Sequence, residues 1–357
     1  MLDLKIIEIK RKNGLKTRFF EIRKIKSIFI TQYQYICYIY PVIKSHFFIF
    51  VVFLMLLFFA KQSQSAFRDS YLGAKSMAMG GAYTALADDV DGILANPAGI
   101  NAIKAQQLTA TTAILHVGLS DESRLSQNIF GYAYKPRKTD SLGILWKQFS
   151  VSSLYYENIF ALSYARSASL YLSKSEQKRP RNLSLGGTIK LMNWDSAPTI
   201  DSYGRTVEDL SGWTGVDFDL GFIIWTSENT PVAVSFQNIR SPNITSSSSN
   251  LKEYLSFTTK MGVAAIEKNF TWVLDLILKN GEIDLKIGAE RKSHDNRLYF
   301  RAGVELANLA WGMNFTAGAG YKPSDSMRID YAFVYPINTI LDTLGSHRIS
   351  IVYDFGE

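Results

Sequence analysis

The sequence predicts an all-β fold: a transmembrane antiparallel β-barrel of about fourteen strands, with an N-terminal hatch in its lumen. Three observations lead to this prediction. An apolar export segment lies near the start, long segments after it alternate between apolar and polar residues, and a small-residue-rich stretch without alternation separates the two. The predicted domains are therefore a leader over 1–65, a hatch over 66–105 and a barrel over 106–357.

The leader has the layout of a secretory signal peptide. Its apolar run, 47–60, has about 14 residues, whereas a membrane-spanning helix needs roughly 20. Lys44 precedes the run, and the small residues Ser63 and Ser65 occupy positions −3 and −1 of a cleavage site before Ala66. More residues stand ahead of the run than a signal peptide needs, so the start of the chain is predicted to be over-extended. A retained membrane anchor is the alternative.

Charge and cysteine content restrict the function classes. The formal charge of +7 arises in the leader, because 1–65 holds 11 of the 39 Lys and Arg but only 3 of the 32 Asp and Glu. The remainder carries 28 basic and 29 acidic residues, so no nucleic-acid partner is expected. Cys37, the single cysteine, lies in the leader. The sequence therefore predicts neither disulfides nor a metal site in the exported chain, and no cofactor.

Period-2 alternation recurs along the rest of the chain, as in 283–290, where Ile, Leu, Ile and Ala alternate with Asp, Lys, Gly and Glu. A soluble β-sandwich would also alternate, but its strands usually have about five or six residues, whereas these run to about ten, the length of a tilted strand across a bilayer. Fourteen is an even number, as closure of a single-chain bacterial barrel requires. The predicted strands are 106–117, 127–135, 142–154, 158–172, 183–193, 215–225, 232–239, 256–266, 270–279, 283–290, 297–306, 310–321, 327–335 and 347–355.

The stretch 73–100 is rich in small residues and does not alternate. Its backbone can therefore pack closely, as a compact segment inside a barrel must. Asp88 or Asp89 is expected to cap a short helix that ends by Asn96, because Pro97 follows. A generic glycine-rich turn of a soluble protein is the alternative interpretation.

The run Met-Gly-Gly-Ala-x-Thr-Ala-x-Ala-Asp-Asp at 79–89, followed by Asn-Pro-Ala-Gly at 96–99, resembles the N-terminal hatch of the FadL superfamily of outer-membrane barrels, and is most similar to its smaller PorV/PorQ-like branch. The resemblance implies a bacterial outer-membrane location, a fourteen-stranded barrel, and hydrophobic compounds that move through the interior and leave through the wall. The hatch role is carried over onto Gly80, Gly81, Ala82, Asn96, Pro97, Ala98 and Gly99.

The C-terminal strand alternates as well, and its apolar positions resemble the signal that the barrel-assembly machinery reads. An ordinary edge strand is the alternative, since Gly356 and Glu357 follow the last aromatic residue. The residues of the proposed signal are Ile349, Ile351, Tyr353 and Phe355.

No catalytic residues are predicted, because only His116, near Ser120, is available as a base. The resemblance implies two functions. One is passage or binding of fatty-acid-like hydrophobic molecules. The other is a PorV-like docking or shuttle role in a type IX-like secretion system. The expected partners are outer-membrane lipid, the barrel-assembly machinery, and either a hydrophobic ligand or secreted proteins.

Overall fold

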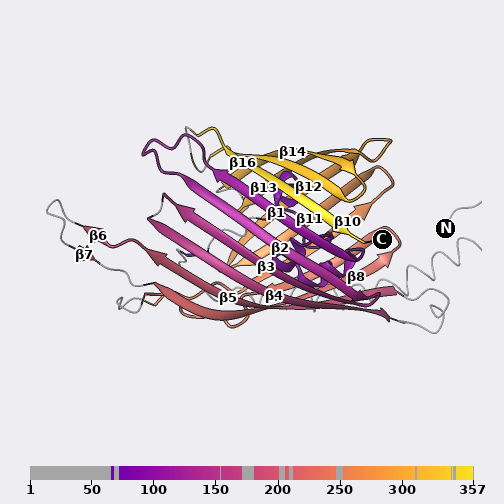
Figure 1. Cartoon of the computed structure of the whole chain (residues 1–357), viewed down its shortest axis with the longest axis horizontal. Coiled ribbons are helices and arrows are strands. Elements are labelled where there is room, and N and C mark those ends of the chain that lie inside the picture. The colour runs from indigo at the N-terminus through magenta and orange to yellow at the C-terminus, as the bar shows by residue number, and fades with distance from the viewer. Residues whose placement is uncertain are drawn as a thin grey trace, which may run out of the picture. The chain divides into compact units, whose positions relative to one another are not determined.

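A closed antiparallel β-barrel makes up most of the computed structural model (Figure 1). The predicted signal peptide lies outside the described residues. None of the described helices is long and apolar enough to cross a membrane. The structure describes residues 66–67, 72–152, 154–170, 181–200, 206–208, 212–246, 252–309, 312–338, 340 and 343–356.

The strands follow one another around the barrel in chain order, each paired with its neighbours, and β1 pairs with β16 to close it. The barrel strands are β1 (Gln106–Leu115), β2 (Leu125–Arg137), β3 (Asp140–Val151), β4 (Tyr155–Leu170), β5 (Arg181–Ser196), β8 (Trp213–Ser227), β9 (Thr230–Gln237), β10 (Thr258–Ile266), β11 (Phe270–Lys279), β12 (Glu282–Lys292), β13 (Leu298–Ala307), β14 (Gly312–Ser324), β15 (Met327–Pro336) and β16 (Ser346–Phe355).

These fourteen strands confirm the predicted fold class, and each overlaps one predicted strand. One sheet was missed. Between β5 and β8, β6 (Thr199–Ile200) and β7 (Thr206–Glu208) form a separate two-stranded sheet where the sequence predicted only a loop. Between β5 and β8 the chain therefore leaves the barrel wall and then returns to pair the two strands.

The alternation of each strand separates a lumenal face from an outer face. On β16, Arg348, Ser350 and Val352 point inward and are at most 3% exposed, while the four apolar residues of the proposed assembly signal are 40–49% exposed. Large apolar side chains are exposed in the same way on strand after strand. Such a wall suits the hydrocarbon region of a bilayer, where apolar side chains face lipid.

The two ends of the barrel differ in the length of their connections. At the end that holds the start of β1 and the end of β16, five of the six connections have two to five residues, and 171–180 has ten. At the other end, 280–281 has two residues, but 116–124 and 238–257 have nine and twenty. Single-chain barrels have short periplasmic turns and longer extracellular loops, so the short-turn end is assigned to the periplasmic side.

Replacing Tyr353 and Phe355 together by Ser is expected to lower the amount of assembled barrel severalfold. The change removes the two aromatic rings, 4.6 Å apart, at the lipid-facing end of the closing strand. Heat-modifiable gel mobility of the outer-membrane fraction measures the folded share. The matched control replaces Tyr321 and Tyr335, also exposed aromatic residues of the wall. Equal assembly of both variants would show that the C-terminal strand carries no special signal.

Candidate functional site

Residues 72–103, here called the inner segment, lie within the ring of strands. The segment contains α2 (Ala74–Ala78), α3 (Gly92–Ala95) and the 3-10 helix η1 (Pro97–Ala102), and nearly all of its described side chains are buried. Helix α2 packs on β13, β14, β15 and β16, whereas η1 packs on β3, β4, β5 and β8. These two sets of strands form opposite walls of the barrel, so the inner segment crosses the lumen from wall to wall.

Glycines of the wall make room for the inner segment. Eight of them, each on a different strand, lie where an added Cβ would come within 3.0 Å of an atom of the segment. We call this set the glycine seat. At each of these positions the inner segment occupies the space that a lumenal side chain would otherwise fill. The members of the glycine seat are Gly131, Gly143, Gly186, Gly221, Gly262, Gly288, Gly303 and Gly318.

The first half of the segment is fixed by backbone hydrogen bonds to lumenal side chains. Gly80 donates its N–H to Thr316 Oγ1 at 2.8 Å, and Thr316 donates in turn to the Ala78 carbonyl. Gly80 has φ +69°, and a Cβ there would lie 2.8 Å from the Val304 carbonyl oxygen, so only glycine fits without strain. The backbone at Thr84 donates to Asp275 Oδ2, which also accepts the hydroxyl of the same residue.

The Asn-Pro-Ala-Gly motif joins the second half of the segment to the opposite wall. The Asn96 side chain donates to the carbonyls of Thr84 and Phe222, and its oxygen accepts the N–H of Ala98. The Ala98 carbonyl accepts the Ser184 hydroxyl at 2.7 Å. The motif therefore links two turns of the inner segment to each other and to strands β5 and β8.

A buried ionic network joins the segment to the wall. Arg328 contacts Asp89 of the segment at 3.1 Å and Asp330 of the wall at 2.6 Å. Asp330 also binds Arg301, which contacts Glu290 at 2.7 Å. Charges in a low-dielectric interior need such partners, and breaking one pair typically costs several kcal/mol.

The predicted cap of the short helix was wrong in detail. Helix α3 does end before Asn96, but its N-cap is Asp91, and no side chain caps it. The carboxylates proposed as caps have ionic partners: Asp88 contacts Lys75 and Asp89 contacts Arg328. Asp89 Oδ1 also accepts the Asp91 N–H at 3.2 Å, in the turn ahead of the helix. Charged partners in a buried site bind a carboxylate more strongly than a single backbone N–H does.

Asp91 makes the inner segment sensitive to pH. Its Oδ2 accepts the Gly73 N–H at 2.9 Å, and burial, helped by the charge of Asp89, raises the pKa of Asp91 to about 8. Between its ordinary pKa, 3.8, and about 8, the folded chain keeps a proton that the unfolded chain has lost, so the stability from this group falls as pH rises. Asp91→Asn is expected to unfold at a higher temperature than the parent at pH 8, with little difference at pH 4. Thermal unfolding at both pH values tests this, with exposed Asp325→Asn as control. Parallel pH profiles would contradict the prediction.

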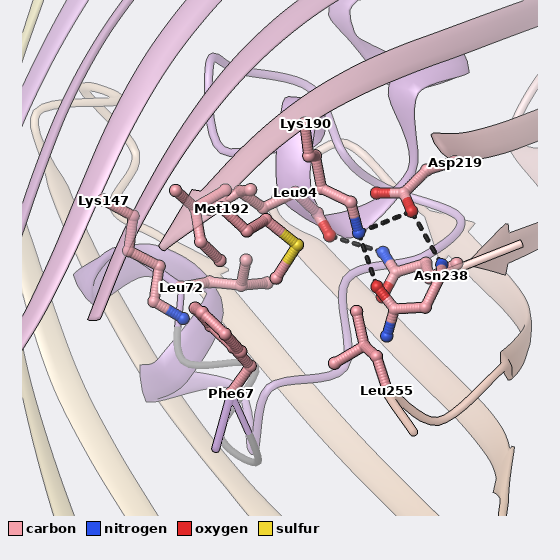
Figure 2. Close-up of a pocket in the computed structure, with 11 residues that line it drawn as sticks. Phe67, Leu72, Leu94, Lys147, Lys190, Met192, Asp219, Asn238 and Leu255 are labelled. Carbon is pink, nitrogen blue, oxygen red and sulfur yellow. Dashed lines mark hydrogen bonds and ion pairs between the residues drawn. The ribbon is translucent and has the colours of Figure 1, made fainter. Parts of the chain in front are cut away.

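A cavity of about 50 Å³ lies between the inner segment and β3, β4, β5, β8 and β9 (Figure 2). Phe67, Leu72, Leu94 and Met192 give it apolar walls. On its polar side, Lys190 Nζ contacts Asp219 at 2.7 Å and is also bonded to Asn238. The space is smaller than the roughly 150 Å³ engineered cavity that admits benzene. A hydrocarbon can therefore enter only if part of the lining moves.

All seven residues carried over by resemblance lie in the inner segment and are buried. Sequence reasoning missed the partners of the inner segment on the wall: Thr316, Asp275 and the glycine seat. Glycine on the polar face of several strands was the available signal for the seat. In the described part of the chain, no group of three or more His, Cys, Asp or Glu residues is arranged to hold a metal ion.

Comparison with solved structures finds the same fold at low sequence identity. The CymD monoaromatic hydrocarbon channel has a TM-score of 0.57 and 16% identity, covering 82% of this chain and 100% of that one. The toluene transporter TbuX of Ralstonia pickettii has 0.53 and 13%, covering 82% and 100%. A Pseudomonas aeruginosa FadL homologue has 0.52 and 11%, covering 83% and 100%. A search of curated protein sequences finds no match.

The closed fourteen-stranded barrel and its apolar outer face define a bacterial outer-membrane β-barrel protein, with the fold that the sequence resemblance implied. Residues 91–353 match a family described as type IX secretion system membrane protein PorP/SprF. The chain belongs to this PorP/SprF family. The sequence resemblance had named the PorV/PorQ-like branch.

Proposed function

We propose that this chain binds hydrophobic small molecules inside its barrel and passes them across the outer membrane, with the inner segment as the gate. The observation that carries the proposal is the cavity between the segment and the wall, which is apolar on one side and polar on the other. The hydrocarbon channels and toluene transporters that share the fold support it. In the same proposal, residues 1–65 direct export and are removed before Ala66, and the barrel-assembly machinery inserts the chain.

The closed state must open for passage. The network at Arg328 and the glycine seat hold the segment in place, whereas the cavity lies beside Phe67 and Leu72, near its start. Movement at this start enlarges the cavity without breaking the contacts around Gly80 and Asn96. The gate is therefore proposed to open at its N-terminal end first.

A cavity-filling substitution tests the proposal. Met192 is 1% exposed and lines the cavity, whereas Leu220, on the neighbouring strand β8, is 45% exposed on the outer face. Met192→Trp is expected to weaken binding of 4-fluorotoluene about tenfold, because the larger side chain occupies the space. Leu220→Trp is expected to bind as the parent does. Fluorine NMR of the ligand with the protein in lipid nanodiscs, referenced to protein-free nanodiscs, measures the binding. Equal affinities in all three proteins would reject the cavity as the site.

A second candidate function is docking of secreted proteins or secretion components in a type IX system. The family match favours it. Deleting the gene and comparing secreted proteins by mass spectrometry tests this role. Expressing the Met192→Trp variant in the deletion strain discriminates between the candidates. Docking on the outside of the barrel predicts that this variant restores secretion fully. A secretion role that depends on the bound small molecule predicts that it does not.

A further inference from the structure

The outer face of the barrel carries a groove of about 610 Å³ over strands β1 to β5. Its volume lies within the range of about 300–1,000 Å³ that is usual for pockets of small ligands. The lining is almost entirely apolar. Phe130, Trp146 and Phe160 stack across β2, β3 and β4, with ring centroids 5.8 Å and 6.3 Å apart and rings inclined by 11° and 17°. Stacked rings leave a flat, rigid floor rather than the uneven surface of branched side chains.

A basic rim lies at the periplasmic end of the same strands. Lys104, Arg137, Lys138 and Arg166 are exposed there. Asp140 is the acidic residue among them, buried, 3.7 Å from Arg166 and accepting the Tyr164 hydroxyl. Among these five described residues, four positive charges and one negative charge leave a net +3. The two-residue turns 228–229 and 325–326 at the same end each carry an acidic residue, Glu228 and Asp325.

The distance between groove and rim lies within half a bilayer. Tyr132 lines the groove and pairs with Ile144 of β3, whereas Arg137, beyond a bulge in β2, pairs with Asp140, so the two lie about 13 Å apart along the strands at roughly 3.3 Å per residue. A tilt of about 40° reduces this to about 10 Å along the membrane normal. One leaflet contributes roughly 15 Å of hydrocarbon, half of about 30 Å. A lipid with its headgroup at the rim therefore reaches the groove with its chain.

We propose that this groove is a specific site for an anionic phospholipid of the periplasmic leaflet. The acyl chain lies on the rings of Phe130, Trp146 and Phe160, and the phosphate of the headgroup binds Arg137 and Lys138. The site is on the outer face, so it neither uses the lumenal cavity nor requires the inner segment to move. It gives the β1–β5 side of the wall a preferred lipid that the remaining strands lack.

Trp146 provides the test, because brominated acyl chains quench a nearby indole. The full chain is reconstituted into phosphatidylcholine vesicles that contain increasing fractions of brominated phosphatidylglycerol, or of brominated phosphatidylcholine as the neutral probe. Trp272 is the matched control, since it is 53% exposed on β11, outside the groove. Trp272→Phe and Trp146→Phe assign the quenching to each residue by difference.

Brominated phosphatidylglycerol is expected to quench Trp146 with about fivefold or greater preference over the neutral lipid, and Trp272 with none, because each basic residue near the surface adds about fivefold. Arg137→Gln with Lys138→Gln is expected to bring the Trp146 preference close to one. Lys268→Gln with Arg297→Gln, at the same end but away from the groove, is expected to leave it unchanged. Equal quenching of Trp146 by both lipids, or a preference that survives loss of the rim, would overturn the proposal.

Discussion

Deleting residues 73–100 is expected to turn a nearly non-conducting barrel into an open pore. The inner segment crosses the lumen between β13–β16 and β3–β8, and the wall beside it carries glycines rather than side chains that fill space. Eight strands already fill their lumen with side chains, while sixteen leave a water channel, so fourteen need a filling segment. Single-channel conductance in planar bilayers is expected to rise about tenfold or more.

Two controls accompany this deletion. Removing the β6–β7 hairpin, Thr199–Glu208, tests for a general effect of shortening the chain, and heat-modifiable mobility shows that each variant is assembled.

Gly80→Val is expected to give a higher conductance than Gly81→Val. The valine at position 80 meets the backbone oxygen of Val304, whereas the valine at position 81 meets the flexible end of Lys286. Pro97→Ala is expected to give a conductance between those of the intact chain and the deletion variant. A large steady conductance of the intact chain would falsify the plugged-barrel interpretation.

Gly186→Val is expected to displace the inner segment although the substituted residue belongs to the wall. A Cβ at Gly186 would lie 2.4 Å from the backbone of Pro97 and Ala98, which has no rotamer to change. Overpacking of this kind costs about 1–3 kcal/mol. The expected result is faster proteolysis within 72–103 and a conductance between those of the intact chain and the deletion variant.

The next residue on the same strand is the matched control. Gly187 points outward, and the nearest atoms to an added Cβ are Leu220 Cδ2 at 3.5 Å and the Asp219 carbonyl oxygen at 3.7 Å, ordinary contact distances. Gly187→Val is therefore expected to leave proteolysis and conductance unchanged. If both variants behaved alike, the glycine seat would be a feature of the strands rather than a fit to the inner segment.

The barrel could be predicted from the sequence because each strand repeats a local pattern. Alternation over 270–279 or 327–335 requires no knowledge of the partner strand, and those predicted bounds differ from the observed ones by at most one residue. The β6–β7 hairpin was missed for the same reason. Its strands have two and three residues, too few for a period of two to be visible.

The contacts of the inner segment could not be predicted, because they join residues far apart in the chain. Gly80 and Thr316 are separated by 236 positions, and Asp89 and Arg328 by 239. A glycine in a strand indicates that something approaches closely, but not which residue does. The Asp88 and Asp89 caps were wrong in detail because local reasoning considered only the nearest backbone N–H groups, whereas the charged partners of these carboxylates are Lys75 and Arg328.

The beginning of the inner segment is tied to the last strand of the chain, and this sets an order of events during biogenesis. The Ala74 N–H donates to Ser350 Oγ on β16, and Arg348 donates to the Leu72 carbonyl, each pair separated by 276 positions. β1 pairs with the same strand, so the docking surface for Leu72 and Ala74 exists only once the C-terminal hairpin is in place. Contacts so remote in sequence form late, because their loop-closure cost must be met first. While the C-terminal hairpin is not yet paired with β1, the inner segment therefore lacks its docking surface. The lumen is then blocked only after the barrel has closed.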